Sequence, residues 1–305
     1  LALDHTRRCH QFNRTLLEQQ INHPDVIDAL NKDSDTWKAG HNEFFGNMTF
    51  ADARSLLGTM GSRMMLGETR HPSAYDSIES IPDSFDARDQ WKGLIHPIRD
   101  QQQCGSCWAF SATEVLADRF AIATGKASPV LSAEDIVSCD SGDMGCSGGQ
   151  LPNAWKYLTN KGVVTDTCFP YTAGSGNAPS CASKCSDSES WTKYKAKNSY
   201  AINGVENMQK EIMTNGPIQV AFKVYKSFMS YKSGVYSKKF WELIPEGGHA
   251  VKIVGWGTES GTDYWLVANS WNTVWGEDGF FKIKRGDDEC GMETMGPPYA
   301  GMPSV

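Results

Sequence analysis

Apolar residues recur at helical spacing after Cys107, which predicts a helix that Gly125 ends. The positions that form this pattern are Trp108, Ala112, Val115, Leu116 and Phe120. A second helix is expected after Ser132, with Asp135 completing a capping box. A third is expected over about 153–160, just before the next glycine. The segment that follows Cys107 is therefore mainly helical.

Shorter helical patterns precede residue 58. One runs from Pro24 to Leu30, and another runs from a Thr49 cap through Leu57. From 58 to 80 the chain is polar and rich in turn residues, which predicts a linker accessible to proteolysis. The chain is therefore expected to divide near residue 80. On these patterns alone, the part before the division could be an ordinary N-terminal helical subdomain.

The last third of the chain contains short apolar runs bounded by turn residues, which predict strands. These runs cover 218–224, 250–254, 264–268 and 280–283. A turn at Glu259-Ser-Gly-Thr joins the second and third runs, so His249 at the start of one should lie near Asn269 at the end of the other. After residue 81 the first half is thus helix-rich and the second half strand-rich, which indicates an α+β fold.

Composition narrows the function classes. A chain of 305 residues is long enough for a large core, and its net charge of −7 without long like-charge blocks makes nucleic acid an unexpected partner. No apolar run approaches the roughly 18 residues of a membrane span. The first residues are too polar for a secretory signal, so any signal is expected to have been removed or omitted. Nine cysteines indicate an oxidising compartment, and sequons at Asn13 and Asn47 are candidate glycosylation sites.

Cys107 is a candidate nucleophile. It follows the turn Gly105-Ser106 and begins a helical pattern, and a helix N-terminus favours a thiolate. The alternative is that Cys107 is half of a disulfide. His249 lies 142 residues later in Gly-Gly-His-Ala-Val, and Asn269 lies in Val-Ala-Asn-Ser-Trp. Because each of the three residues lies in a distinctive local sequence, their joint occurrence favours a catalytic site over a chance combination of structural residues.

The segment Gln-Gln-Gln-Cys-Gly-Ser-Cys-Trp-Ala-Phe, with the distant histidine and asparagine, resembles the papain-like cysteine peptidases. The segments 81–91, 132–135, 231–236 and 269–273 are most similar to the cathepsin B-like subgroup, and 36–42 resembles its propeptide. The resemblance implies a papain-like two-lobe fold. A helical lobe of about 100–195 would face an antiparallel, barrel-like lobe of about 196–300, with the cleft between them. It further implies an inhibitory propeptide over 1–80, cut near Ser80 or Ile81, before a catalytic domain over 81–305.

The resemblance also assigns roles. Cys107 would attack the peptide carbonyl, His249 would transfer the proton and Asn269 would orient the imidazole. The Gln101 side chain and the Cys107 backbone N–H would form the oxyanion hole. The implied substrate-binding residues are Gly148, Gly149, Leu151, Ala221, Ala250, Trp271 and Met295. No metal or organic cofactor is implied. The implied partners are peptide and protein substrates, the chain's own propeptide and cystatin-like inhibitors, in the secretory pathway, either in a lysosome-like compartment or secreted.

Cysteine spacing alone leaves the disulfide pairing open, and Cys181-x-x-x-Cys185 also has plausible zinc-ligand spacing. The resemblance selects three disulfides and leaves Cys290 free, with Cys9 in the propeptide. The selected pairs are Cys104–Cys146, Cys139–Cys181 and Cys168–Cys185.

The chain departs from cathepsin B at two places. Only 12 residues separate Cys168 from Cys181, with no histidine and no further cysteine, so the loop that would block the primed side is reduced to a short, flexible segment. This favours an endopeptidase over a peptidyl-dipeptidase. Met295 falls where cathepsin B has an acidic residue, although one register slip would place Glu293 there instead. A non-catalytic peptide-binding homologue is the alternative from a different class.

Overall fold

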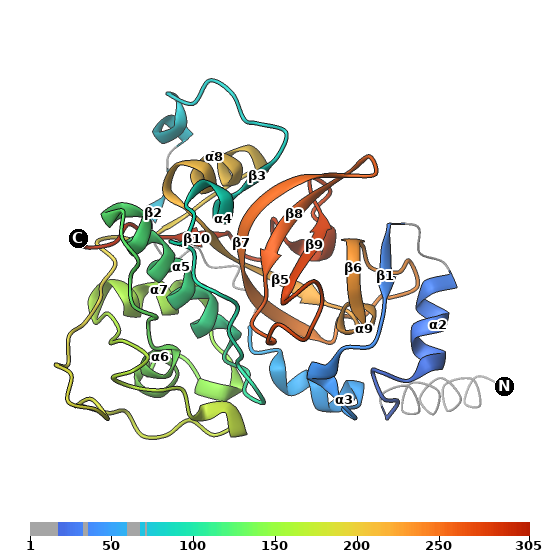
Figure 1. Cartoon of the computed structure of the whole chain (residues 1–305), viewed down its shortest axis with the longest axis horizontal. Helices are drawn as coiled ribbons and strands as arrows, with labels where there is room; N and C mark the ends of the chain where they lie inside the picture. The colour runs from blue at the N-terminus through green and yellow to red at the C-terminus, as the bar shows by residue number, and fades with distance from the viewer. Residues whose placement is uncertain (1–17, 33–35, 60–67, 71) are drawn as a thin grey trace.

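The computed structural model describes residues 18–32, 36–59, 68–70 and 72–305 (Figure 1). The predictions for Cys9 and Asn13 lie outside this part of the chain. The helices between residues 107 and 160 gather on one side and most of the sheet lies on the other, where the helices between residues 24 and 56 also lie (Figure 1). This is as expected for an α+β chain with a helical and a β-rich lobe. Among the described residues no helix has the length and apolar character needed to cross a bilayer.

Three helices form the helical lobe: α5 (Cys107–Thr124), α6 (Ala133–Cys139) and α7 (Leu151–Asn160). Helix α5 is buried along most of its length, and Gly125 ends it in the left-handed conformation with a φ of 64°, as predicted. Helix α7 begins two residues before the predicted start.

The capping box predicted for α6 is only half formed. The Ser132 side chain accepts a hydrogen bond from the Asp135 backbone N–H at 3.1 Å, as expected. The Asp135 carboxylate, however, accepts hydrogen bonds from the Val164 backbone N–H and the Tyr157 hydroxyl, both at 2.8 Å, and pairs with Lys193. Because Asp135 is buried, its charge is better satisfied by these tertiary partners than by the helix N-terminus.

The described strands form one sheet. Its order is β1-β6-β9-β8-β7-β5-β10-β4-β2, and β3 pairs with β7 off this path. The four predicted strands are present as β5 (Ile218–Val224), β7 (Gly247–Glu259), β8 (Thr262–Ala268) and β9 (Phe280–Lys284). The remaining strands are β1 (Trp37–Ala39), β2 (Glu68–Thr69), β3 (Phe85–Asp86), β4 (Tyr200–Ala201), β6 (Tyr231–Tyr236) and β10 (Tyr299–Ala300).

The sheet is open within the described residues, because β1 and β2 stand at its two ends. Most neighbours are antiparallel, but β6–β9 and β2–β4 are parallel. Two further helices, α8 (Val205–Asn215) and α9 (Lys226–Met229), complete this half of the chain. Helix α4 (Ala87–Gln90) follows β3 at the start of the region expected to be catalytic.

The N-terminal segment packs along the β-rich lobe. It contains α2 (Pro24–Lys32), α3 (Phe50–Ala53) and the 3₁₀ helices η1 (Glu43–Phe45) and η2 (Arg54–Leu56). Strand β1 adds to the sheet beside β6, with Trp37 opposite Gly234 (Figure 1). The two helices predicted for this region are therefore confirmed, and Thr49 caps the second one in a complete capping box with Asp52.

The stretch from 58 to 80 differs from the expected linker. Its described part contains β2 and a 3₁₀ helix, η3 (Pro72–Tyr75), and the Tyr75 side chain is only 2% exposed. The sequence shows no hydrophobic periodicity that would predict these elements, because each is too short to have one. Their ordered structure depends on contacts with the rest of the chain.

Three disulfides join the predicted pairs, Cys104–Cys146, Cys139–Cys181 and Cys168–Cys185. The zinc interpretation of Cys181 and Cys185 is therefore wrong. In the described part of the chain the free cysteines are Cys107 and Cys290, and no cluster there could hold a metal ion.

The segment between Cys168 and Cys181 is short, but its first half is not the flexible loop expected. Ala173 and the following glycine are buried, and the Glu134 carboxylate accepts hydrogen bonds from the backbone N–H groups of Thr172 and Ala173. The Tyr171 hydroxyl donates to the Gln101 carbonyl oxygen at 2.8 Å. These contacts fix the segment against the turn that leads to Cys107.

Candidate active site

Cys107 is fully buried at the first position of α5. Burial raises the pKa of its thiol. The positive charge of His249, together with hydrogen bonds from His249, Thr59 and the Ala250 backbone, outweighs that effect and lowers the pKa to about 7. A thiol with this pKa is present as the reactive thiolate in a substantial fraction near neutral pH.

His249 and Asn269 lie together because one hairpin brings them there. Strand β7 pairs with β8 from Glu259 opposite Thr262 back towards Lys252 opposite Ala268, so residues 249 and 269 meet at the far end of the hairpin. The Nε2 atom of His249 lies 2.7 Å from Oδ1 of Asn269. The other ring nitrogen, Nδ1, has no nitrogen or oxygen partner in the described structure, which leaves it available to the Cys107 sulfur.

Trp271 covers this pair. Its ring centroid lies 4.8 Å from that of His249, and both side chains are fully buried. The indole also packs against Phe44 and Phe45 of the N-terminal segment. Trp271 therefore excludes water from the His249–Asn269 hydrogen bond.

Of the three consecutive glutamines, only Gln101 is buried. Its Nε2 donates hydrogen bonds to the carbonyl oxygens of Leu56 and Cys104, both at 2.8 Å. Its Oε1 accepts from the Ser270 hydroxyl at 2.7 Å, which fixes the orientation of the amide. The amide N–H₂ group thus points at a carbonyl oxygen of the N-terminal segment.

Residues 56–59 of the N-terminal segment cover Cys107. The Gly149 backbone N–H donates to the Gly58 carbonyl at 2.8 Å, and the Thr59 N–H donates to the Gly248 carbonyl at 3.1 Å. The Thr59 hydroxyl lies 3.2 Å from the Cys107 sulfur. A β-carbon on Gly148 would lie 2.7 Å from the Gly58 carbonyl oxygen, so the close approach requires glycine there.

The apolar residues that the resemblance implies for substrate binding lie close to this site. Ala221 pairs with Ala250 across β5 and β7, and both belong with Leu151 to the buried cluster that contains Cys107. A β-carbon on Gly248 would lie 2.7 Å from the Met295 terminal methyl, so Met295 lies beside the strand that carries His249.

Glu293 lies elsewhere. Its carboxylate accepts hydrogen bonds from the Trp265 indole N–H at 3.0 Å and the Gly286 backbone N–H at 2.7 Å. It therefore closes a local turn and holds a buried tryptophan. Met295, and not Glu293, therefore lies against the start of β7 beside His249.

Several participants were not apparent from the sequence. The Leu56 carbonyl, Thr59 and Tyr171 lie in stretches without a distinctive pattern, and no local signal marks them. Ser270 has one signal, because it directly follows Asn269. Asn47 is exposed, as a glycosylation site requires, and its modification stays a prediction.

A buried cysteine at a helix N-terminus, beside a histidine–asparagine pair on an adjoining sheet, is the arrangement of a cysteine peptidase. The family model for papain family cysteine proteases matches residues 81–297, and the chain belongs to this family.

The relatives to which the chain is similar include cathepsin B-like proteins. The chain is 40% identical to cathepsin B-like CP2 of Giardia intestinalis over 94% of each sequence. It is 39% identical to cathepsin B-like cysteine proteinase 6 of Caenorhabditis elegans, over 90% of this chain and 82% of the relative. Among solved structures, proCathepsin B S9 from Trypanosoma congolense superposes with a TM-score of 0.86 and 34% identity, over 94% of this chain and all of the other.

Proposed function

We propose that this cathepsin B-like cysteine peptidase is an endopeptidase made as a zymogen, with residues 1–80 as its propeptide and 81–305 as its catalytic domain. The observation that carries the proposal is the convergence of Cys107, His249 and Asn269 under the segment 56–59. A complete set of catalytic groups covered by the chain's own backbone is what a latent peptidase requires. The complete set also argues against a peptide-binding homologue that has lost its catalytic residues.

The mechanism follows from the positions of these groups. The Cys107 thiolate attacks the carbonyl carbon of the scissile bond, and a carbon–sulfur bond forms. Protonated His249 transfers its proton to the leaving amine as the carbon–nitrogen bond breaks. Water, deprotonated by His249, then attacks the acyl-enzyme and releases the acid. Asn269 keeps the imidazole in position throughout.

The oxyanion that forms during attack needs fixed donors. The Gln101 amide donates to the Leu56 carbonyl in the latent chain, and Ser270 holds that amide in place. We infer that the substrate carbonyl takes the place of the Leu56 carbonyl and is stabilised by Gln101 and the Cys107 backbone N–H. Gly149, whose N–H now binds the Gly58 carbonyl, would bind the extended substrate backbone on the other side.

Latency is relieved at low pH in this proposal. A hydrogen bond from the Thr49 backbone, and a second from the Thr49 side chain, lower the pKa of Asp52 in α3. A carboxyl whose pKa is lower in the folded segment than in the unfolded one stabilises the folded segment at pH values above the unfolded pKa. This stability is lost as the pH falls through the folded pKa. The segment that carries Asp52 is also tied to the β-rich lobe by the ion pair between Arg54 and Glu246, at 2.5 Å. Acid should therefore favour release of the propeptide and its removal.

The short segment between Cys168 and Cys181 supports endopeptidase activity. It carries no cation that could bind a substrate's terminal carboxylate, and its first half is fixed on the Gln101 turn. The primed side is then open to longer chains. Met295, with Leu151, Ala221 and Ala250 as neighbours, makes an apolar pocket that should favour leucine over arginine two residues upstream of the cut.

The test compares the intact and acid-treated chains, with N-terminal sequencing of the product. We expect little activity before treatment, a new N-terminus near Ile81, and activity afterwards that Cys107→Ala abolishes. Internally quenched peptides with free and amidated C-termini should be cut about equally. Full activity in the uncut chain would contradict the zymogen proposal, and dependence on a free C-terminus would instead indicate a peptidyl-dipeptidase.

We further propose that the enzyme acts in the secretory pathway, in a lysosome-like compartment or after secretion. Its three disulfides support this, because such bonds persist in oxidising compartments.

A further inference from the structure

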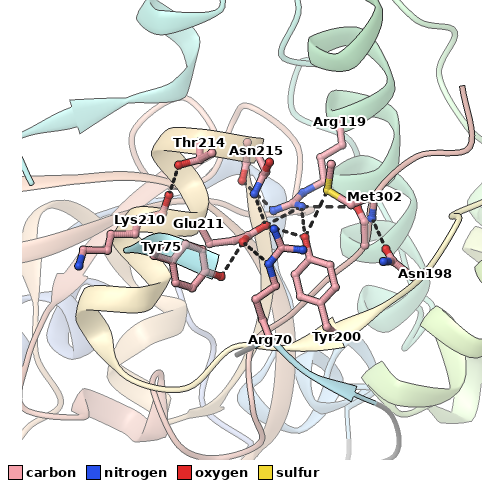
Figure 2. Close-up of polar contacts among 12 residues, drawn as sticks. Arg70, Tyr75, Arg119, Asn198, Tyr200, Lys210, Glu211, Thr214, Asn215 and Met302 are labelled. Atoms are coloured by element: carbon pink, nitrogen blue, oxygen red, sulfur yellow. Dashed lines mark hydrogen bonds and ion pairs between the residues drawn. The ribbon is translucent and has the colours of Figure 1, made fainter. Parts of the chain in front are cut away.

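Residues 68–70 and 72–75 dock on the molecule far from Cys107. Strand β2 lies parallel to β4, with Glu68 opposite Tyr200, and the Arg70 backbone N–H donates to the Ala201 carbonyl at 2.8 Å. The side chain of Arg119, in the last part of α5, belongs to the same contact region (Figure 2). Since Arg119 is twelve residues beyond Cys107, the two are separated by about 18 Å along the helix axis.

The contact centres on the Glu211 carboxylate of α8, which is fully buried. Its Oε1 accepts hydrogen bonds from the Arg119 guanidinium at 2.9 Å, the Tyr200 hydroxyl at 2.8 Å and the Asn215 amide at 3.1 Å. Its Oε2 accepts from the Tyr75 hydroxyl at 2.6 Å (Figure 2). Residues after 81 therefore satisfy one oxygen, and the N-terminal segment satisfies the other.

Arg70 reinforces the contact from the same segment. Its guanidinium lies 4.7 Å above the Tyr200 ring, and its Nε lies 3.9 Å from the Oε2 atom of Glu211 (Figure 2). Burial, and then the nearby Glu211 charge, raise the pKa of the Tyr75 hydroxyl, so this group remains a proton donor. A cation and a phenol five residues apart thus converge on a single carboxylate oxygen.

Removal of residues 1–80 would leave three matching features uncovered. The edge of β4 would lose its partner strand, the Glu211 Oε2 atom would lose its hydrogen bond, and the space filled by the Tyr75 ring would empty. An unpaired strand edge binds extended peptides, and a buried acceptor without a donor is unfavourable. Together these features select a peptide with an extended part that pairs with β4, a cation, and a turn that presents a phenol.

We propose that this surface is a second peptide-binding site of the processed peptidase, separate from the catalytic site, and that its ligand is the chain's own segment 68–80. The site recognises the backbone of residues 68–70 through β4 and the Tyr75 hydroxyl through Glu211. This proposal rests on the proposed removal of residues 1–80. It adds a site that binds the peptide 68–80 without occupying the catalytic site.

The experiment uses a labelled peptide with the sequence of residues 68–80 and the acid-processed enzyme, with Cys107 alkylated by a peptide-like inhibitor. The inhibitor fills the catalytic site, so any binding occurs elsewhere. The matched control is the same peptide carrying Tyr75→Phe, which removes only the hydroxyl. We expect saturable binding by fluorescence anisotropy, weakened about tenfold or more by Tyr75→Phe, because a hydrogen bond to a charged acceptor is lost. Absence of binding, or equal binding of the two peptides, would overturn the proposal.

A second arm separates this proposal from the zymogen proposal. It uses the full chain with Cys107→Ala, with and without Arg70→Ala and Tyr75→Ala. The chain with the weakened segment should bind the labelled peptide, whereas the parent chain should exclude it because its own segment occupies the site. No difference between the two chains would overturn the proposed site. Failure of acid processing would count against the zymogen proposal alone.

Discussion

Gly58 offers a direct test of how the N-terminal segment blocks the active site. A β-carbon at this position would lie 1.7 Å from the Gly105 carbonyl oxygen and 2.3 Å from its carbonyl carbon. These are backbone atoms of the turn before Cys107 and cannot rotate away. Gly58→Ala must therefore displace the segment, by about 1.3 Å if the new methyl group is to reach 3.0 Å from that oxygen.

Such a shift removes three hydrogen bonds. The Gly58 carbonyl loses the Gly149 N–H, the Leu56 carbonyl loses the Gln101 amide, and the Gly248 carbonyl loses the Thr59 N–H. At about 0.5–1.5 kcal/mol net for each bond, the segment binds more weakly by about 1.5–4.5 kcal/mol. The population with an open active site should rise by about 10- to 2000-fold.

The assay measures alkylation of Cys107 and hydrolysis of a fluorogenic peptide by the uncut chain at neutral pH, with gels to show that the chain stays intact. Ser55→Ala is the control, because it alters the same segment at an exposed hydroxyl that donates only to the Asp52 carbonyl. We expect Gly58→Ala to show the rise and Ser55→Ala to match the parent. If the intact Gly58→Ala chain showed no more Cys107 alkylation or peptide hydrolysis than the parent, this explanation of latency would be refuted.

Three further predictions concern the catalytic groups and the pocket. The alkylation rate of Cys107 should increase with pH through a midpoint near 7 and fall at pH values below it. His249→Ala should move this midpoint to higher pH, because a buried thiol without a neighbouring cation resists ionisation. In the processed enzyme, Gln101→Ala should lower kcat by about 100- to 1000-fold, since it removes one oxyanion donor, and Asn269→Ala should cost less than His249→Ala, as steady-state kinetics would reveal. Met295→Glu should improve kcat/KM for peptides with arginine at the second upstream position by about tenfold relative to leucine, and an unchanged ratio would show that Met295 lies outside the pocket.

The sequence by itself determined most of the local structure around the site. The period after Cys107 and the stop at Gly125 predicted α5, and turn residues 259–262 predicted the hairpin that joins His249 to Asn269. These predictions succeeded because each depends on neighbours along the chain. Family resemblance added the disulfide pairing, which the spacing of the cysteines had left open.

Tertiary structure decided what lies against the site. The Leu56 carbonyl meets the Gln101 amide across 45 residues, and Tyr75 reaches Glu211 across 136. Neither contact has a local signature, because it depends on how separate elements pack. The same holds for the Asp135 carboxylate, which accepts a hydrogen bond from the Val164 backbone and does not complete the helix cap. It also holds for Glu293, which binds the Trp265 indole, while Met295 lies beside the active site. In each case a buried polar group takes the partner that packing brings within reach, since an unpaired group would be costly there.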